Sequence, residues 1–254
     1  MTEPALLSRE SGAILQLTLN RPDKRNAFSA ALFHELRDAF AALPSDVRAV
    51  VLAGEGKHFC SGLDLSEHKI AEPFPSVLYS REGHRIFDSI KNCGRPIVTA
   101  MQGAVIGGGL ELACCTHIRV AETGTFYELP EGRRGIFLGG GGTVHVRRII
   151  GAGRLTEIML TGRRVTAEEG QQMGLSHYLV EPGQARTKAL ELAERVAQNA
   201  PISNYLMLTA IDMIDTMPPE AGLFTEAIAQ ALTLTTGDAQ AGMDAFLQKR
   251  DVKF

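Results

Sequence analysis

The chain has 254 residues, of which 44 % are hydrophobic and 22 % charged, with a formal net charge of −3 at pH 7. This length supports one large domain, or one domain with a small appendage, around a substantial core. The acidic balance argues against a nucleic-acid-binding protein, which needs a basic surface. No apolar stretch approaches the ~20 residues of a membrane-spanning helix, and the first residues show no targeting pattern. We therefore expect neither a membrane nor a nucleic-acid partner.

Cysteine and histidine usage points to a reducing compartment and away from a metal site. The adjacent pair Cys114-Cys115 lies in an apolar run, as expected of small buried hydrophobic residues. Cys60 and Cys93 complete no CxxC motif, and the seven histidines form no HExxH or i, i+4 pair. The sequence thus favours a cytoplasmic enzyme that binds no metal.

The first half of the chain alternates short apolar runs with amphipathic segments. Gly12–Asn20 alternates apolar and polar residues and predicts a first strand. Ala30–Leu43 has helical periodicity, with Ser29 as its N-cap. The other expected elements here are a buried strand at Arg48–Ala53, a mobile segment at Ser66–Pro75, a helix at Val77–Asn92, and strands at Pro96–Met101 and His117–Ala121.

From Thr143 onward the pattern is mainly helical. We expect one short strand at Leu175–Val180, and helices at Val144–Ile150, Arg154–Leu160, from Thr166 onward, and at Gln184–Asn199, Pro201–Met213, Glu220–Thr235 and Asp238–Gln248. Asp238 is the expected N-cap of the last helix. The economical architecture is an α/β core over residues 1–198, with a helical region over residues 199–254 that packs on a neighbouring subunit.

A glycine-rich stretch at Gly103–Cys115 is the most unusual feature of the sequence. Three consecutive glycines precede a helix-forming segment that contains one carboxylate, Glu111. Glycines at a helix N-terminus expose backbone N–H groups that favour an anion. A carboxylate in such an apolar segment is costly unless it is paired or used. These features suggest a small active site.

A second glutamate, Glu131, follows a proline in the glycine-rich loop over residues 129–143. Each glutamate has a structural alternative: Glu111 paired with Arg119, and Glu131 as a solvated loop residue. If the two carboxyls meet in an apolar pocket, one holds a proton near neutral pH, and the pair can position a water molecule. Neither glycine run fits a nucleotide-binding motif. A Ser61 or Cys60 nucleophile is disfavoured, because no base partner is evident nearby.

Six segments together resemble the signature blocks of the crotonase family, also called the enoyl-CoA hydratase/isomerase superfamily. They are LNRPDKRNAF (19–28), FCSGLDL (59–65), GAVIGGGLELA (103–113), LPEGRRGIFLGGGGT (129–143), LTGRRVTAEEGQQMGL (160–175) and GMDAFLQKRDVKF (242–254). The resemblance covers essentially the whole chain, in order. It implies an α/β fold of repeated ββα units in a spiral, with a helical C-terminal trimerisation region, and a homotrimer or a dimer of trimers.

The resemblance also implies residue roles. In the family, an acyl-CoA thioester oxygen is held by two backbone N–H groups, which fall here on Leu63 and Gly108 and suit a developing oxyanion. Glu131 would exchange the Cα proton, and Glu111 would orient and activate the water. The residues that line up with CoA contacts are Lys24, Arg25, Ala27, Lys57, Ser61, Gly62, Asp64 and Leu65. No cofactor is implied beyond the CoA moiety of the substrate.

The implied reaction is the addition of water across the 2,3 double bond of an enoyl-CoA, or the reverse dehydration. The alternatives are an enoyl-CoA isomerase, a specialised dehydratase or hydrolase of the same family, and a non-catalytic acyl-CoA-binding protein. Two departures concern the substrate. Glu128 adds a third acid near Glu131, and Gly132-Arg133-Arg134 stands where apolar residues are more usual. An arginine there would meet a CoA phosphate, a carboxylated acyl tail or solvent.

Overall fold

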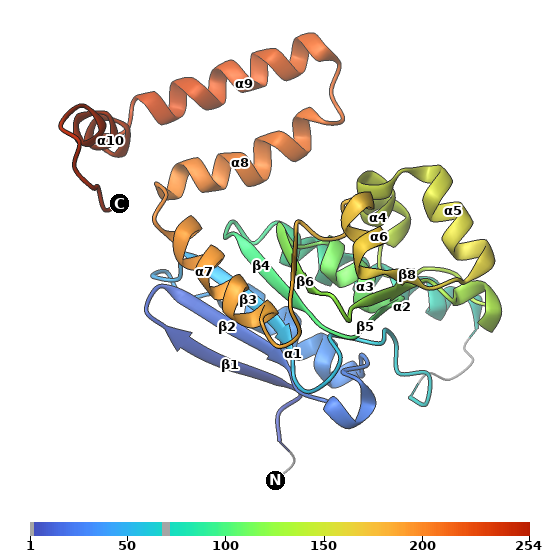
Figure 1. Cartoon of the computed structure of the whole chain (residues 1–254). Helices are drawn as coiled ribbons and strands as arrows, with labels where there is room; N and C mark the ends of the chain where they lie inside the picture. The colour runs from blue at the N-terminus through green and yellow to red at the C-terminus, as the bar shows by residue number, and fades with distance from the viewer. Residues whose placement is uncertain (1–2, 68–71) are drawn as a thin grey trace.

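The computed structural model describes residues 3–67 and 72–254 (Figure 1). The segment predicted to be mobile, Ser66–Pro75, lies partly outside the described residues, at 68–71. Over the rest of the chain the structure is a mixed α/β fold, in which the larger sheet is parallel beyond its first strand. The α/β class predicted from the sequence is therefore confirmed.

The larger sheet has the strand order β1-β2-β3-β4-β6-β9 within the described residues. Its strands are β1 (Leu6–Ser11), β2 (Ile14–Leu19), β3 (Ala49–Gly54), β4 (Ile97–Met101), β6 (Ile118–Glu122) and β9 (Tyr178–Val180). A smaller sheet joins β5 (Ala104–Ile106), β7 (Phe126–Glu128) and β8 (Val165–Thr166). The short β5 runs directly into the glycine stretch, so this second sheet positions the residues that follow it.

The helices cover both faces of the larger sheet and then extend beyond it (Figure 1). They are α1 (Ala30–Ala41), α2 (Pro73–Lys91), α3 (Gly108–Cys114), α4 (Gly142–Ile150), α5 (Ala152–Thr161), α6 (Ala167–Met173), α7 (Ala185–Ala197), α8 (Pro201–Ile214), α9 (Pro219–Leu234) and α10 (Gly237–Leu247). The described residues also form two 3₁₀ turns, η1 (Pro22–Lys24) before α1 and η2 (Glu131–Arg134) between α3 and α4.

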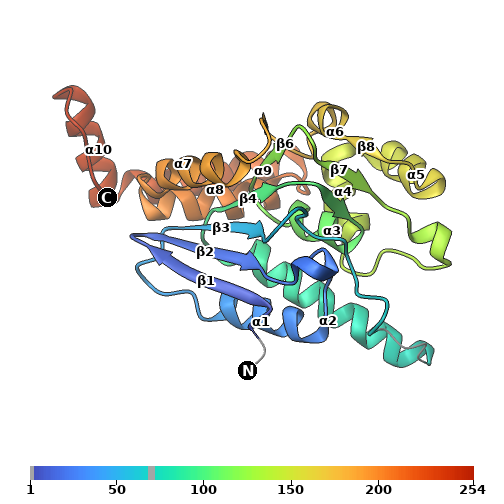
Figure 2. The same cartoon turned by 60° about the horizontal axis from the view of Figure 1, so that its bottom comes forward.

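The side chains of β3 face two hydrophobic cores in turn, one on each side of the larger sheet. Val50 and Leu52 face a large core that α1, α2 and α3 cover, while Val51 and its neighbours face α7. Because successive side chains of a strand point to opposite faces, a strand buried on both sides reads as a continuous apolar run. Figure 2 shows α1 and α2 on one side of the sheet and α7 on the other.

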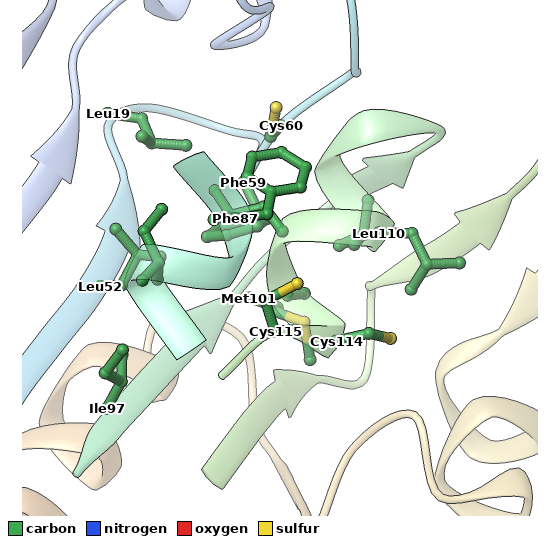
Figure 3. Close-up of a cluster of buried hydrophobic side chains, with 14 of the residues drawn as sticks. Leu19, Leu52, Phe59, Cys60, Phe87, Ile97, Met101, Leu110, Cys114 and Cys115 are labelled. Carbon is green, nitrogen blue, oxygen red and sulfur yellow. The ribbon is translucent and has the colours of Figure 1, made fainter. Parts of the chain in front are cut away.

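The larger core extends from the sheet to the helix that carries Glu111. Figure 3 shows Phe87 of α2 and Met101 of β4 packed near Leu110, Cys114 and Cys115 of the α3 segment. Both cysteines are buried, and all four cysteines of the chain are free thiols. Their packing role is the one that the sequence predicted.

Three sequence expectations are corrected by the structure. An additional strand, β1, precedes the predicted first strand and pairs with it through a tight turn at Gly12, where φ is +59°. Helix α2 begins at Pro73 rather than Val77, since proline suits the first turn of a helix. The N-cap of α10 is Thr236, whose hydroxyl accepts a hydrogen bond from Ala239 N–H at 3.2 Å, and not Asp238.

The helical hairpin of α8 and α9 and the following α10 extend away from the sheet (Figure 1). One guanidinium ties both ends of this region to the core. Arg48, just before β3, donates to the carbonyl of Asn199 at 2.7 Å and to that of Phe254 at 2.9 Å. Between these ends, Asp212 of α8 pairs with Lys91 of α2 at 2.7 Å and with Arg148 of α4 at 3.1 Å.

Histidine side chains anchor the starts of strands in the described chain. His117 Nδ1 accepts a hydrogen bond from Ile97 N–H at 3.0 Å, at the start of β4. His177 and His58 accept in the same way from Arg119 and Ala104. An Nδ1 acceptor requires the neutral ring, and burial lowers the pKa of His117 from 6.5 to about 4.

The free energy of unfolding should therefore fall in acid. Because the folded-state pKa of His117 lies below its ordinary value, the unfolded chain binds the proton first, and the stability present above pH 6.5 is lost as the pH falls toward 4. The slope should be ~1.4 kcal/mol per pH unit from this residue. Urea denaturation of the native chain and of His117→Gln measures it. The variant should lose part of the pH dependence in this window, and identical slopes would refute the assignment.

Candidate active site

A cavity of about 250 Å³ brings together three segments that are distant in the sequence. It is lined by residues 61–63 and Leu65, by the glycine stretch with Glu111, and by residues of the loop from Glu131 to Gly140. Residues of α1 and α2 complete the wall. They include Phe33, Tyr79, Ile86 and Phe87, and Phe28, just before α1, also lines the cavity. The wall is therefore mainly apolar, with the two predicted glutamates within it.

Glu111 lies in α3, four residues after the N-cap Gly107, with its side chain 4 % exposed. Its carboxylate accepts hydrogen bonds from Gly140 N–H at 3.0 Å and from Gly142 N–H at 2.7 Å. Burial raises the pKa of Glu111 to about 7, helped by the charge of Glu131 and opposed by the two N–H donors. Near neutral pH this carboxyl is thus poised between its acid and its base form.

The glycines of the second glycine-rich loop are required by this contact. A Cβ atom on Gly142 would lie 2.8 Å from Glu111 Cγ, and one on Gly140 would lie 2.7 Å from the Phe87 ring. Gly142 is also the first residue of α4, so its N–H has no partner within the helix. Gly140 and Gly142 therefore let the backbone hold a carboxylate at close range.

Glu131 begins the 3₁₀ turn η2, and its side chain is 6 % exposed. Its Oε2 atom is buried without a hydrogen-bond partner among the described residues. Burial raises the pKa of Glu131, while hydrogen bonding to its own backbone and the charge of Arg134 lower it. A Cβ on Gly107 would lie 2.6 Å from Glu131 Oε1, so the carboxyl rests against the start of α3.

The Gly62 and Gly108 backbones meet at the same cavity. Gly62 has a φ of +86°, and a Cβ there would lie 3.1 Å from Gly108 N. Phe28 N–H donates to Gly62 O at 2.8 Å, and Asp64 N–H donates to Phe28 O at 3.0 Å. The N–H of Leu63, which lies between Gly62 and Asp64, has no backbone acceptor among the described residues. Gly108 is the first residue of α3, so its N–H has no partner within the helix. Both residues line the cavity.

The residues predicted to contact CoA fall into two groups. Ser61, Gly62 and Leu65 line the cavity. Lys24 and Arg25 lie next to Ser61, whose N–H donates to Arg25 O at 3.0 Å and whose hydroxyl donates to Lys24 O at 3.4 Å.

The remaining three lie off the cavity wall. Asp64 is buried, pairs with Arg21 at 3.0 Å and accepts from Ser66, so it stabilises the turn after Leu63. Ala27 is buried, and its carbonyl accepts from Arg21. Lys57 lines a separate surface hollow beside Gln102. The structure does not bring Lys57 to the cavity.

The structural alternatives weighed for the acids are resolved by their partners. Arg119 is buried and donates to the carbonyls of Thr116, Gly174 and Leu175, so the proposed pairing with Glu111 is wrong. Glu128 pairs with Arg164 at 2.8 Å and is not part of the cavity wall.

The structure also argues against Cys60 as a nucleophile. Cys60 is fully buried and donates to Asn26 O, and burial raises its pKa to about 12, so a reactive thiolate is not formed. The sequence did not predict the two backbone N–H groups that donate to Glu111. The one available signal was the run of four glycines at Gly139–Gly142.

The described part of the chain contains no group of three or more His, Cys, Asp or Glu side chains arranged to hold a metal ion. Within it, no helix combines the length and the apolarity needed to cross a membrane.

Comparisons with known proteins identify the family. The sequence model of the enoyl-CoA hydratase/isomerase family matches residues 9–254. The chain is 34 % identical to YngF of Bacillus subtilis, provisionally assigned as an enoyl-CoA hydratase/isomerase, with 98 % of this chain and 97 % of that protein covered. It is 31 % identical to the 2,3-dehydroadipyl-CoA hydratase of Escherichia coli, over 98 % and 97 % of the two chains.

A solved structure is more similar still. The crystal structure of a provisionally assigned enoyl-CoA hydratase from Rhodopseudomonas palustris superposes with a TM-score of 0.95 at 46 % identity, covering 98 % of this chain and 97 % of the other. The chain therefore belongs to the enoyl-CoA hydratase/isomerase family and has the crotonase fold.

The contact between the glycine loop and Glu111 can be tested by adding one methyl group. Gly142→Ala should displace the Glu111 side chain and lower the free energy of unfolding by about 1–3 kcal/mol, as overpacking does. Thermal and urea unfolding measure the change. Gly153→Ala is the matched control, because nothing lies within 4 Å of a Cβ at this helical position. The control should be neutral or slightly stabilising; equal losses in both variants would contradict the tight contact.

Proposed function

We propose that the protein is an enoyl-CoA hydratase, which adds water across the 2,3 double bond of an enoyl-CoA thioester or catalyses the reverse dehydration. The observation that carries the proposal is one cavity that holds two buried glutamates and two N–H groups without backbone acceptors among the described residues. Hydration needs three things at once: a base for the water, an acid for Cα, and stabilisation of the enolate between them.

The electron movements fit these groups. The N–H groups of Leu63 and Gly108 hold the thioester oxygen. Glu111 accepts a proton from water as the water oxygen bonds to Cβ, and the double-bond electrons pass to the thioester oxygen. The resulting enolate collapses as Cα takes a proton from Glu131. The reverse sequence removes water from a 3-hydroxyacyl thioester.

The two glutamates titrate as one unit. Burial raises the pKa of both, to about 7 for Glu111, and the charge of Glu131 further disfavours ionisation of Glu111. A pair that shares one proton near neutral pH has one ionised carboxylate for the water and one carboxylic acid for Cα. Transfer of the proton between them restores the starting state after each turnover.

Binding of the CoA moiety is proposed for the segments that border the cavity. Ser61, Gly62 and Leu65 would contact the pantetheine, and Lys24 and Arg25, exposed beside Ser61, would meet phosphate. Ala27 and Lys57 are proposed as further CoA contacts outside the cavity. Asp64 is proposed to act by supporting the turn after Leu63. No further cofactor is proposed. The four free cysteines support a cytoplasmic location.

The proposal is supported by relatives named as hydratases, among them the Escherichia coli enzyme described above. An enoyl-CoA isomerase is the rival within the family, and the products discriminate between them. A hydratase forms a 3-hydroxyacyl thioester from a 2-enoyl thioester, whereas an isomerase forms a 2-enoyl from a 3-enoyl thioester without net consumption of water.

Removing either carboxylate should abolish most of the activity. Glu111→Gln and Glu131→Gln should each lower kcat for crotonyl-CoA by ~10²–10⁴-fold, since each loses one proton transfer. The rate is followed as loss of the absorbance of the conjugated thioester, with the 3-hydroxyacyl product identified by mass spectrometry. Glu128→Gln is the matched control, because Glu128 pairs with Arg164 away from the cavity. Full hydration activity in Glu111→Gln would refute the mechanism.

A homotrimer, or a dimer of trimers, is proposed from the surface of α8, α9 and α10. These helices carry a large set of exposed apolar side chains: Met207, Ile211, Met213, Leu223, Phe224, Ile228, Leu232, Leu234, Met243, Phe246 and Leu247. Monomeric proteins rarely expose so many large apolar side chains on three consecutive helices, so a subunit interface is the expected cover.

Light scattering after size exclusion tests the assembly. The native chain should elute with three or six times its subunit mass of 27.4 kDa. Phe246→Glu should shift the mass toward the monomer, because Phe246 is 83 % exposed within one chain and would place a charge in the interface. Leu160→Glu, at an isolated residue of α5 that is 81 % exposed, should leave the mass unchanged. A monomeric native chain would disprove the proposal.

A further inference from the structure

Arg134 shares the cavity wall with Glu131. Both belong to η2, which runs from Glu131 to Arg134, and both line the cavity. A 3₁₀ helix has three residues per turn, so residues three apart lie on the same side of it. With a rise of ~2 Å per residue, the backbone positions of the two residues lie ~6 Å apart along the axis.

The turn that aims Arg134 is held by backbone contacts at both ends. Arg133 N–H donates to Pro130 O at 3.1 Å, and Ile136 N–H donates to Glu131 O at 3.1 Å. Gly135 ends the turn with a φ of +68°, a conformation that suits glycine. The side on which Arg134 projects is therefore fixed by the same turn that positions Glu131.

Arg134 is an exposed residue whose charge acts on the carboxyl of Glu131. Among the lysines and arginines of the described chain, it is the one that lines the cavity. Its guanidinium makes no hydrogen bond or ion pair with a described residue, and its electrostatic effect falls on Glu131. The adjacent Arg133 differs, because it donates to Thr161 O at 2.8 Å and packs against Gly162, away from the cavity.

The cavity wall beyond Glu131 and Arg134 is mainly apolar, although His34 and Glu82 also line it. Ile136, Phe137 and Leu138 follow Arg134 in the sequence and line the same cavity, and Tyr79 and Phe87 of α2 also contribute. An apolar wall that bears one cation matches an alkyl chain that ends in an anion. Arginine suits a carboxylate especially well, because its planar fork can donate two parallel hydrogen bonds.

We propose that Arg134 binds a carboxylate at the end of the acyl chain, so that the preferred substrates are CoA thioesters of unsaturated dicarboxylic acids. The inference rests on the proposed enoyl-CoA chemistry of the same cavity. A contact of Arg134 with a CoA phosphate, or with solvent alone, is a distinct outcome of the test below.

Binding of two saturated thioesters of equal chain length isolates the terminal group. Adipyl-CoA and hexanoyl-CoA both carry six-carbon acyl groups and cannot be hydrated, so calorimetry measures their Kd values without turnover. The native chain should bind adipyl-CoA about tenfold more tightly, the effect of one charge-assisted hydrogen bond. Arg134→Leu should abolish this ratio. Arg133→Leu is the matched control and should keep it.

The opposite results are equally definite. Equal affinity of the native chain for both thioesters, or a ratio that persists in Arg134→Leu, would overturn the inference. An equal loss of affinity for both thioesters in Arg134→Leu would also overturn it, since this result would indicate a contact with the CoA moiety.

Turnover separates this inference from the proposed function. Hydration of hexenoyl-CoA without any preference for adipyl-CoA would leave the hydratase standing and remove the carboxylate site. Loss of the tenfold ratio in Arg134→Leu, in a protein that hydrates no enoyl-CoA, would support the carboxylate site and remove the hydratase.

Discussion

The site depends on the close approach of backbone to carboxylate. Glu111 is buried under a loop whose glycines leave no room for a Cβ, and two N–H groups of that loop partly compensate for the lost solvation. If the loop were farther away, burial would drive the pKa of Glu111 higher still and leave it fully protonated. If it made more contacts, the carboxylate would be fixed as an anion. The loop sets the balance between these two forms.

The carboxyl of Glu131 has fewer hydrogen-bond partners than that of Glu111. It has one buried oxygen without a partner among the described residues, in contrast to the two donors that Glu111 receives. An unpaired buried oxygen is costly, and such a cost persists where a ligand is expected to supply the missing contact. The two acids thus differ in their surroundings, and this difference supports the separate roles proposed for them.

Much of this arrangement could be predicted from residue order, because local patterns carry it. Residues close together in the chain predict the buried strand β3, the N-cap at Ser29 and the glycine-rich start of the helix that carries Glu111. The partners of Glu111 could not be predicted, since Gly140 and Gly142 reach it only after α3 and α4 have packed. Arg119 was a reasonable partner by charge, yet three carbonyls from two other segments satisfy it. Such long-range polar contacts leave no periodic signal.

The double contact of Arg48 has a mechanical consequence for the helical region. Asn199 and Phe254 mark the beginning and the end of a long excursion of the chain, and one side chain binds both. Such a closure resembles a noncovalent crosslink, which limits the freedom of the excursion as a whole without stiffening any part of it. Residues 199–254 would then open and close as one cooperative unit, and hydrogen exchange there would follow a single rate. Together with the ion pairs of Asp212, this closure would hold the apolar helices in one orientation toward a neighbouring molecule.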